Sequence, residues 1–390
     1  MSAESLAPAY SRARVAERLL LTGHSHQAWP DVALEGVVEA FEDATRLLDE
    51  KWERAFAKAE AVRDGFRGWL AEPPAELALG ASTHELVLRF LSALDLRARP
   101  RLVSTDGEFH TLRRQLARLG EEDGVEVVRV AAEPPGTLAQ RIAAAVDDRT
   151  AAVLVSAVLF ETARVVPGLD SLAAACARHG TELLVDAYHA LGPLPFPVRD
   201  LGLGAAWVLG GGYKYLQLGE GNCFLRVPEH AGALRPVITG WYAEFAALAD
   251  EHDPGRVGYG TGAARFAGST YDPTSHYRAA RVFAFFAERG LTPPVLRASY
   301  RRQLDRLRAG FDALDLPDAV VTRDRDTPPE AFGGFLALVA PDAARLQREL
   351  AAHGVLCDSR GRYLRLGPAP YVSDTQLDAA VAALGEVARG

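Results

Sequence analysis

The chain has 390 residues, of which 48% are hydrophobic and 24% charged, and its formal net charge is -8. The length predicts more than one domain, and the composition predicts a packed core rather than a disordered chain. The negative charge argues against nucleic acid as a partner, and the sequence has neither an apolar run long enough to span a membrane nor the apolar core of a secretory signal. The cysteines, Cys176, Cys223 and Cys357, are too far apart in sequence for a disulfide framework or a zinc pattern, so we expect a reduced, cytoplasmic protein.

The first half of the chain predicts an α/β fold. Residues 1–30 are expected to form an extended arm, and a long helix is predicted from 31 to 70. From 77 to 227, short apolar runs alternate with helical ones, which favours a mostly parallel sheet with helices on both faces. The run GNCFLRVPE (221–229) follows Lys214 too closely for a helical crossover, so we expect it to be an antiparallel strand.

The second half predicts a smaller α+β unit. A loop-rich region (228–273) precedes helices expected at 275–289 and 294–314, and strands and helices are mixed after residue 317. We therefore predict an N-terminal arm (1–30), a large domain (31–260) and a small C-terminal domain (261–390).

Lysine is rare in this sequence, and one lysine has an unusual setting. Of 43 basic residues only Lys51, Lys58 and Lys214 are lysines. Lys51 and Lys58 lie in a helical pattern beside acidic residues, as solvated charges do. Lys214 lies among glycines, aromatics and apolar residues, where an amine can lose its proton and form an imine, which a guanidinium cannot. The alternative is a stray surface lysine.

Asp186 ends a buried-strand pattern, and a carboxylate there lies at the sheet edge where open α/β folds bind ligands. Such a group can pair with the ring nitrogen of pyridoxal 5′-phosphate (PLP), and Lys214 follows after another strand-like segment. A helix cap or turn aspartate is the alternative.

Two further segments follow predicted strands. Gly80, Ser82 and Thr83 open a helix whose free N–H groups can bind phosphate, although serine and threonine are also ordinary helix caps. Phe109 lies at a strand-to-helix junction, where it can stack on a flat ring or belong to the core.

The segments DAYHALG (186–192) and GGYKYLQLGEG (211–221) resemble the PLP site of kynureninases and, more distantly, that of the class V aminotransferase group. The resemblance continues in TGHSHQAWP (22–30), STHEL (82–86), RFAGSTYDP (265–273) and GVLCDSRGRYLRLGPAPY (354–371). It implies fold type I, with a seven-stranded type of sheet, and a homodimer with shared active sites.

The resemblance also implies a role for each matched residue. Lys214 would bind PLP as a Schiff base and move protons, and Asp186 would pair with the ring nitrogen. Arg365 would bind the substrate carboxylate through two parallel hydrogen bonds, and His24 would contact the substrate. Trp241 would lie near both cofactor and substrate. The other residues expected at the cofactor are Ser82, Thr83, Phe109, Ser156, His189, Tyr213 and, from the second subunit, Thr270.

This sequence departs from the kynureninase pattern in several places. His24 replaces an asparagine, the turn 269–273 replaces an Asn-Pro-Pro turn, Phe109 is offset, and 159–161 carries Leu-Phe-Glu. Most of these positions choose the substrate rather than hold the cofactor, so the resemblance does not predict kynurenine itself. His24 and His26 offer two metal ligands without a third, so no metal site is expected.

We therefore predict a PLP-dependent enzyme that cleaves a side-chain bond of an amino acid, by C–C hydrolysis or β-elimination. An aminotransferase is one alternative. A cysteine desulfurase or C–S lyase is another, for which Cys357, eight residues before Arg365, would be a nucleophile unless it is simply a buried thiol. A non-catalytic binding module of the same fold is the alternative from a different class.

Overall fold

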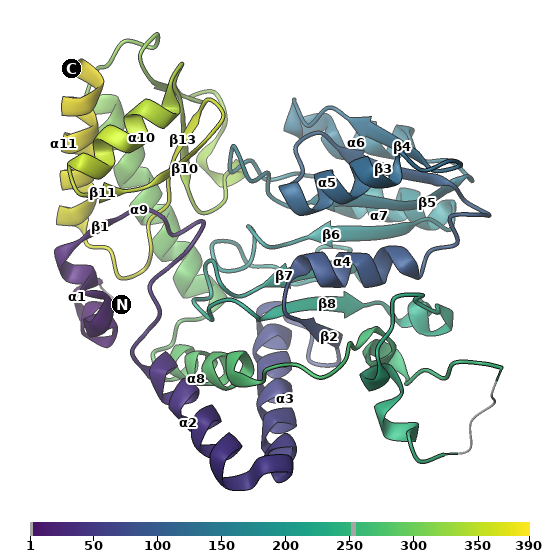
Figure 1. The fold of residues 1–390 in the computed structure, drawn as a ribbon. Helices are drawn as coiled ribbons and strands as arrows, with labels where there is room; N and C mark the ends of the chain where they lie inside the picture. The colour runs from purple at the N-terminus through teal and green to yellow at the C-terminus, as the bar shows by residue number, and fades with distance from the viewer. Residues whose placement is uncertain (1–2, 251–254) are drawn as a thin grey trace.

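The computed structural model describes residues 3–250 and 255–390; residues 1–2 of the predicted arm and 251–254 of the loop-rich region lie outside the described residues. At its centre is a seven-stranded sheet of order β2-β8-β7-β6-β5-β3-β4 (Figure 1). The strands are β2 (Glu76–Gly80), β3 (Arg101–Thr105), β4 (Glu126–Val130), β5 (Thr150–Ser156), β6 (Glu182–Asp186), β7 (Trp207–Gly211) and β8 (Cys223–Val227).

The sheet is parallel except at one strand. β3, β4, β5, β6 and β7 pair in parallel, and β8 runs antiparallel between β7 and β2. This arrangement confirms the predicted mostly parallel sheet and the antiparallel strand at 223–227. A connection of only 11 residues, from 212 to 222, joins β7 to β8, so the chain returns beside the strand it has just left.

Side chains alternate between two buried faces along the central strands. On β5, Val153 and Val155 join one apolar cluster, and Ala152 and Leu154 join another on the opposite face. Four helices cover the two faces: α6 (Leu138–Ala144) and α7 (Leu169–Arg178) on the first, α4 (Thr83–Ser92) and α5 (His110–Leu119) on the second. Apolar residues on both sides of each strand therefore produce the layered α/β fold.

A smaller unit follows, with a four-stranded antiparallel sheet of order β12-β13-β10-β9. Its strands are β9 (Thr322–Arg323), β10 (Leu336–Val339), β12 (Asp358–Arg360) and β13 (Tyr363–Leu366). Its helices are α9 (Pro293–Ala313), α10 (Ala343–Ala352) and α11 (Asp374–Arg389). This part has the predicted α+β character. The proposed boundary at residue 261 stays a prediction, and α8 (Thr274–Glu288) packs against helices from the start of the chain.

Two predicted segments differ in the structure. The helix expected over 31–70 is two helices, α2 (Val32–Leu47) and α3 (Lys51–Trp69), because Leu48 has a φ of 50° and interrupts the α-helical path. The arm is not simply extended: it begins with α1 (Ala3–Leu6) and a 3₁₀ helix. These turns form because they bury Leu6 and Tyr10 in the core.

The arm ends in β1 (Leu19–Leu20), which pairs with β11 (Val355–Leu356) of the smaller unit. Among the described residues, the structure contains no helix with the length and hydrophobicity needed to cross a membrane.

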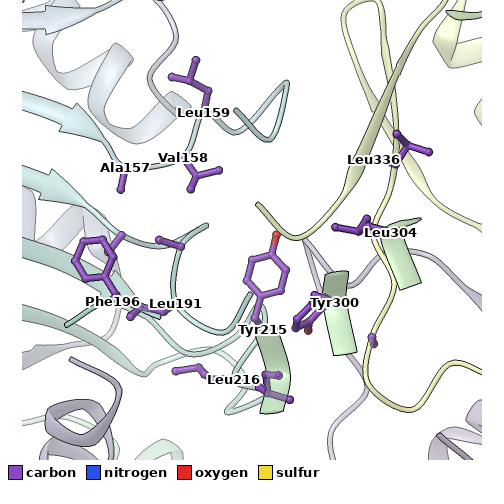
Figure 2. Packing of buried hydrophobic residues seen from close by; sticks show 14 of the residues in the cluster. Ala157, Val158, Leu159, Leu191, Phe196, Tyr215, Leu216, Tyr300, Leu304 and Leu336 are labelled. Carbon is purple, nitrogen blue, oxygen red and sulfur yellow. The ribbon is translucent and has the colours of Figure 1, made fainter. Parts of the chain in front are cut away.

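The apolar core continues between the large sheet and α9. Figure 2 shows Tyr215 between Leu191 and Phe196 on one side and Tyr300 and Leu304 on the other. The rings of Tyr215 and Tyr300 meet edge to face, with their centroids 5.5 Å apart. Because Tyr215 follows Lys214 directly, this packing fixes the backbone that carries the lysine.

A buried ion pair joins three segments of the chain at the edge of the large sheet where β7 begins. Arg226 of β8 donates from Nε to Oε2 of Glu72 at 2.9 Å and from Nη2 to Oε1 at 2.8 Å. Arg226 also donates to the carbonyl oxygens of Gly204 and Ala206, which precede β7. The pair thus connects β8 to the segments that lead into β2 and β7.

We expect Glu72→Ala to lower the free energy of unfolding by about 3–5 kcal/mol, because it leaves the buried Arg226 charge without its partner. Denaturant unfolding followed by circular dichroism measures the change. Glu60→Ala, which removes a half-exposed carboxylate on α3, is the control and should cost about 0–1 kcal/mol. A Glu72→Ala protein as stable as the wild type would contradict this role.

Candidate active site

Polar side chains follow three neighbouring strands of the large sheet at the edge where those strands end. Ser156 ends β5 and Asp186 ends β6, and these two residues are direct partners in the parallel pairing. Lys214 comes three residues after the end of β7. Since carboxyl ends of parallel strands meet at one edge, the sheet topology brings the three side chains together. All three line one small cavity.

The glycines before Lys214 let its loop lie close to the sheet. A Cβ on Gly211 would stand 2.5 Å from the Tyr188 hydroxyl, and one on Gly212 would stand 2.2 Å from the Leu218 side chain. Both distances are far below contact, so neither position accepts a side chain without movement. The GGG run is therefore a packing requirement, and it places Lys214 against the end of β6.

The Lys214 amine is buried among rings and beside a histidine. Its Nζ donates to Nε2 of His189 at 2.7 Å and lies 4.7 Å from the ring centroid of Tyr188 and 5.3 Å from that of Phe109. Burial lowers the pKa of Lys214 to about 7, and although Asp186 opposes this shift, the positive charge of Arg365 adds to it. Lys214 is thus an amine that can be neutral under physiological conditions.

His189 is a neutral partner for that amine. Burial, together with the positive charge of Lys214, lowers the pKa of His189 well below its usual value. Its Nδ1 lies 3.5 Å from the Tyr215 hydroxyl, so the ring is held between Lys214 and the core tyrosine. A neutral imidazole can accept the lysine proton in a hydrogen bond without adding a second charge.

Two carboxyl groups lie at the same sheet edge. Asp186 accepts a hydrogen bond from the Tyr188 amide at 2.8 Å, and burial raises its pKa although that bond and Lys214 oppose the shift. Glu108, just after β3, is almost fully buried, and burial raises its pKa to about 7. A positive charge placed in the cavity would stabilise the ionised form of either group.

The residues expected near a phosphate divide between two environments. Thr83, at the start of α4, lines the cavity with Tyr213. Ser82 is the N-cap of α4, where its hydroxyl accepts from the Glu85 amide at 3.3 Å, so in this structure it has the capping role that was the alternative. The helix start leaves further N–H groups available to an anion.

Arg365 and His24 share one carboxylate. Arg365 donates from Nε and Nη2 to the two oxygens of Asp358, at 2.8 and 2.5 Å, and from Nη1 to the Phe160 carbonyl oxygen. His24 Nε2 lies 2.7 Å from Asp358. Although burial works against it, hydrogen bonds from His24 and Arg365 hold the pKa of Asp358 well below its usual value. Burial lowers the pKa of His24 to about 4.

Arg365 is not among the residues that line the Lys214 cavity. Phe160 lines that cavity, and its carbonyl oxygen accepts the hydrogen bond from Arg365 Nη1. The pairing of Arg365 with Asp358 was not anticipated from the sequence. It follows from the register of the small sheet, where Asp358 of β12 is the direct neighbour of Arg365 on β13.

Trp241 and Thr270 lie together, away from the cavity residues named above. The Trp241 indole donates to the Thr270 hydroxyl at 3.3 Å, and 45% of Trp241 is exposed. Thr270 lines a separate groove of about 990 Å³ between α3, β2 and residues 261–278. Within one chain, neither residue joins the Lys214 group.

Cys357 has the properties of an inert thiol. It is buried between β11 and β12, and burial raises its pKa to about 12. A thiol is nucleophilic only as the thiolate, so Cys357 in this position is not an activated nucleophile.

Three residues at this site were not predicted from the sequence. Tyr188 and Val158 line the cavity, and Glu108 bonds to Ser156 behind its wall. Phe160, one of the departures from the kynureninase pattern, also lines the cavity. A signal for Glu108 was present, because it follows a strand of the parallel sheet as Asp186 does. The expected residues that line the cavity are Thr83, Phe109, Ser156, Asp186, His189, Tyr213 and Lys214.

These residues fit PLP. Lys214 supplies an amine with a depressed pKa for an imine, and Asp186 supplies a buried carboxylate that lacks a full counter-charge. Phe109 and Tyr188 present aromatic faces, and the start of α4 offers N–H donors to a phosphate.

No protein-family model matches the chain. It is 25% identical to the uncharacterized aminotransferase YcbU of Bacillus subtilis over 207 residues, 53% of this chain and just over half (54%) of that relative. It is 24% identical to a kynureninase of Bacillus cereus over 363 residues, 90% of this chain and 80% of that protein.

Solved structures are similar along the whole chain. A cysteine desulfurase of Thermococcus onnurineus has a TM-score of 0.81 at 16% identity, covering 99% of this chain and 98% of its own. C-DES with glycine covalently linked to its PLP cofactor has a TM-score of 0.83 at 16% identity, covering 98% and 99%. The chain has fold type I and is class V aminotransferase-like. The structural similarity establishes the architecture, and the relatives agree with the resemblance to kynureninases and class V aminotransferases.

Proposed function

We propose that the protein is a PLP-dependent enzyme that cleaves a side-chain bond of an amino acid, in the manner of kynureninases and β-lyases. The observation that carries the proposal is the buried Lys214 amine, 2.7 Å from a neutral His189 and in one cavity with Asp186. Burying an amine, an imidazole and a carboxyl group together costs stability, so their presence favours a chemical role over a non-catalytic module.

The chain's own groups divide the work. When bound, PLP supplies a ring that takes up electrons from an amino-acid carbanion. Lys214 Nζ accepts and returns the substrate α-proton, since its pKa of about 7 lets both protonation states occur near neutral pH. His189 holds Nζ in place, and Asp186 stabilises positive charge at the end of β6.

Arg365 has N–H groups left for a substrate carboxylate. A guanidinium carries five N–H donors, and the bonds to Asp358 and Phe160 use three of them. The two-point contact with Asp358 fixes the plane of the guanidinium, which prepares its remaining donors. We assign carboxylate binding to Arg365 and the orientation of Arg365 to Asp358 and His24.

Side-chain cleavage is favoured over desulfuration with a cysteine nucleophile because Cys357 is buried and protonated. C–C hydrolysis is favoured among the cleavages because the similarity to kynureninase extends over 90% of the chain. Neither observation requires kynurenine as the substrate.

A homodimer completes the proposal. Trp241 and Thr270, which the family resemblance assigns to the site, lie outside the Lys214 cavity, so they can reach a site only on another chain. The segment around them exposes large apolar side chains, including Val237 and Phe245, that a subunit interface would cover.

The purified protein mixed with PLP is expected to absorb visible light, and borohydride should fix the cofactor to Lys214. Peptide mass mapping locates the modified lysine, with Lys51 and Lys58 as internal references. Lys214→Ala should lose the attachment and reduce turnover by at least 10³-fold, because the α-proton loses its acceptor. A colourless protein, or one modified elsewhere, would refute the proposed cofactor site.

The products distinguish the reactions. With kynurenine, its hydroxylated form, cysteine conjugates and amino-donor pairs as substrates, C–C hydrolysis releases alanine and β-elimination releases pyruvate. We expect one of these two, detected by mass spectrometry of single-turnover mixtures. A keto acid formed with conversion of the cofactor to its amine form would instead show transamination and would overturn the proposed reaction.

Light scattering is expected to give a mass near twice the 42.0 kDa of the chain. Phe245→Asp should shift the protein toward monomers and lower activity together, since it places a charge in the proposed interface. Leu201→Asp, at an exposed leucine between β6 and β7, is the matched control. A fully active wild-type monomer would exclude shared sites.

A further inference from the structure

Glu108 is a buried carboxyl group that the chemistry above does not use. It lies between β3 and α5 with 1% of its surface exposed. Its Oε2 accepts from the Ser156 hydroxyl at 2.5 Å, and its Oε1 accepts from the Thr105 hydroxyl at 2.7 Å and the Ser156 amide at 3.2 Å. Three donors on one carboxyl group define its position closely.

The hydrogen bond between Glu108 and Ser156 determines whether the Ser156 hydroxyl offers a donor or an acceptor to the cavity. A serine has a single O–H proton, and while Glu108 is ionised this proton is donated to Oε2, so the Ser156 oxygen can only accept hydrogen bonds from the cavity side. When Glu108 is protonated, its own O–H can donate to Ser156, and the serine proton is released toward the cavity. One proton on Glu108 therefore reverses the direction of the hydrogen bond.

The surroundings of Glu108 favour a change near neutral pH. β3 contributes the Thr105 hydroxyl, β5 the Ser156 hydroxyl and amide, and β6 the Asp186 carboxylate. Lys214 lines the cavity that Ser156 also lines. Burial raises the pKa of Glu108 to about 7, with hydrogen bonds opposing the shift and the Asp186 charge adding to it.

We propose that Glu108 is a proton-holding positioning residue, whose protonation state decides whether Ser156 donates or accepts a hydrogen bond at the wall of the Lys214 cavity. The effect on a bound ring rests on the proposed PLP function. Below the Glu108 pKa Ser156 is a donor toward the ring, and above it an acceptor. A group without a role in the chemistry thus couples the cofactor to pH.

Glu108→Gln tests the relay, because the amide places a permanent donor where Oε2 accepts from Ser156. The PLP-loaded wild type is expected to show a change in visible absorbance between pH 5 and pH 8 as Glu108 loses its proton. Glu108→Gln should keep the low-pH spectrum through this range, and Ser156→Ala should lose the same step while retaining Glu108. Identical titrations in the wild type and both variants would overturn the proposal.

Thermal unfolding gives a second measurement that does not need the cofactor. A carboxyl whose pKa is raised on folding stabilises the protein below its unfolded pKa, and this contribution is lost as pH rises through the folded value. The unfolding midpoint of the wild type should therefore fall more between pH 5 and pH 8 than that of Glu108→Gln, whereas Ser156→Ala, which removes a hydrogen bond that lowers the Glu108 pKa, should fall at least as much as the wild type.

The two measurements separate the possible failures. A wild type that takes up no PLP would refute the proposed function, and the unfolding series alone would then decide whether Glu108 holds a proton. A coloured wild type whose unfolding has the same pH dependence as that of Glu108→Gln would refute the inference and leave the cofactor assignment standing.

Discussion

Removing a primary amine from water disfavours its charged form, and the arrangement around Lys214 follows from this desolvation. Aromatic rings surround Nζ, and His189 supplies an acceptor without supplying a charge. Burial and the positive charge of Arg365 lower the pKa of Lys214, whereas the Asp186 carboxylate raises it. These opposing effects bring the amine close to neutrality, where it can act as a nucleophile and as a base.

The two edges of the large sheet carry different features: a cavity lies at one, and a buried ion pair lies at the other. At the carboxyl ends of the parallel strands, Ser156, Asp186 and Lys214 meet around a cavity. At the opposite edge, the Glu72–Arg226 pair joins the segments that enter β2 and β7, and Arg226 makes four hydrogen bonds within the protein. The same sheet therefore has one edge with a cavity that a ligand can fill and another edge where buried charged groups pair within the protein.

Residue type and position were enough to predict part of this site. Lys214 was a candidate because it is one of only three lysines and lies among glycines and aromatics, and Asp186 was a candidate because it ends an apolar strand pattern. Glu108 also follows a predicted strand, but its contact with Ser156 could not be predicted, because only the strand order β6-β5-β3 shows that the end of β3 lies beside Ser156. The pairing of Arg365 with Asp358 likewise depends on strand register, which the sequence leaves open.

The overall fold could likewise be predicted only in part. Apolar alternation predicted the layers, and a short connection predicted antiparallel β8, since both are local properties. The break at Leu48 was missed because a single residue with positive φ leaves the helical spacing of its neighbours intact. The separation of Trp241 and Thr270 from Lys214 within one chain was also not predictable, because it depends on how distant segments fold together.

The pairing of β1 with β11 joins the two ends of the sequence next to the site. Residues 19–20 hydrogen-bond to 355–356, and His24 bonds to Asp358, more than 300 residues later. During synthesis, the arm must therefore wait until nearly the whole chain has left the ribosome before its strand has a partner. The residues that line the Lys214 cavity, from Thr83 to Lys214, are synthesised well before Arg365, so the charge that helps burial to lower the Lys214 pKa is added last.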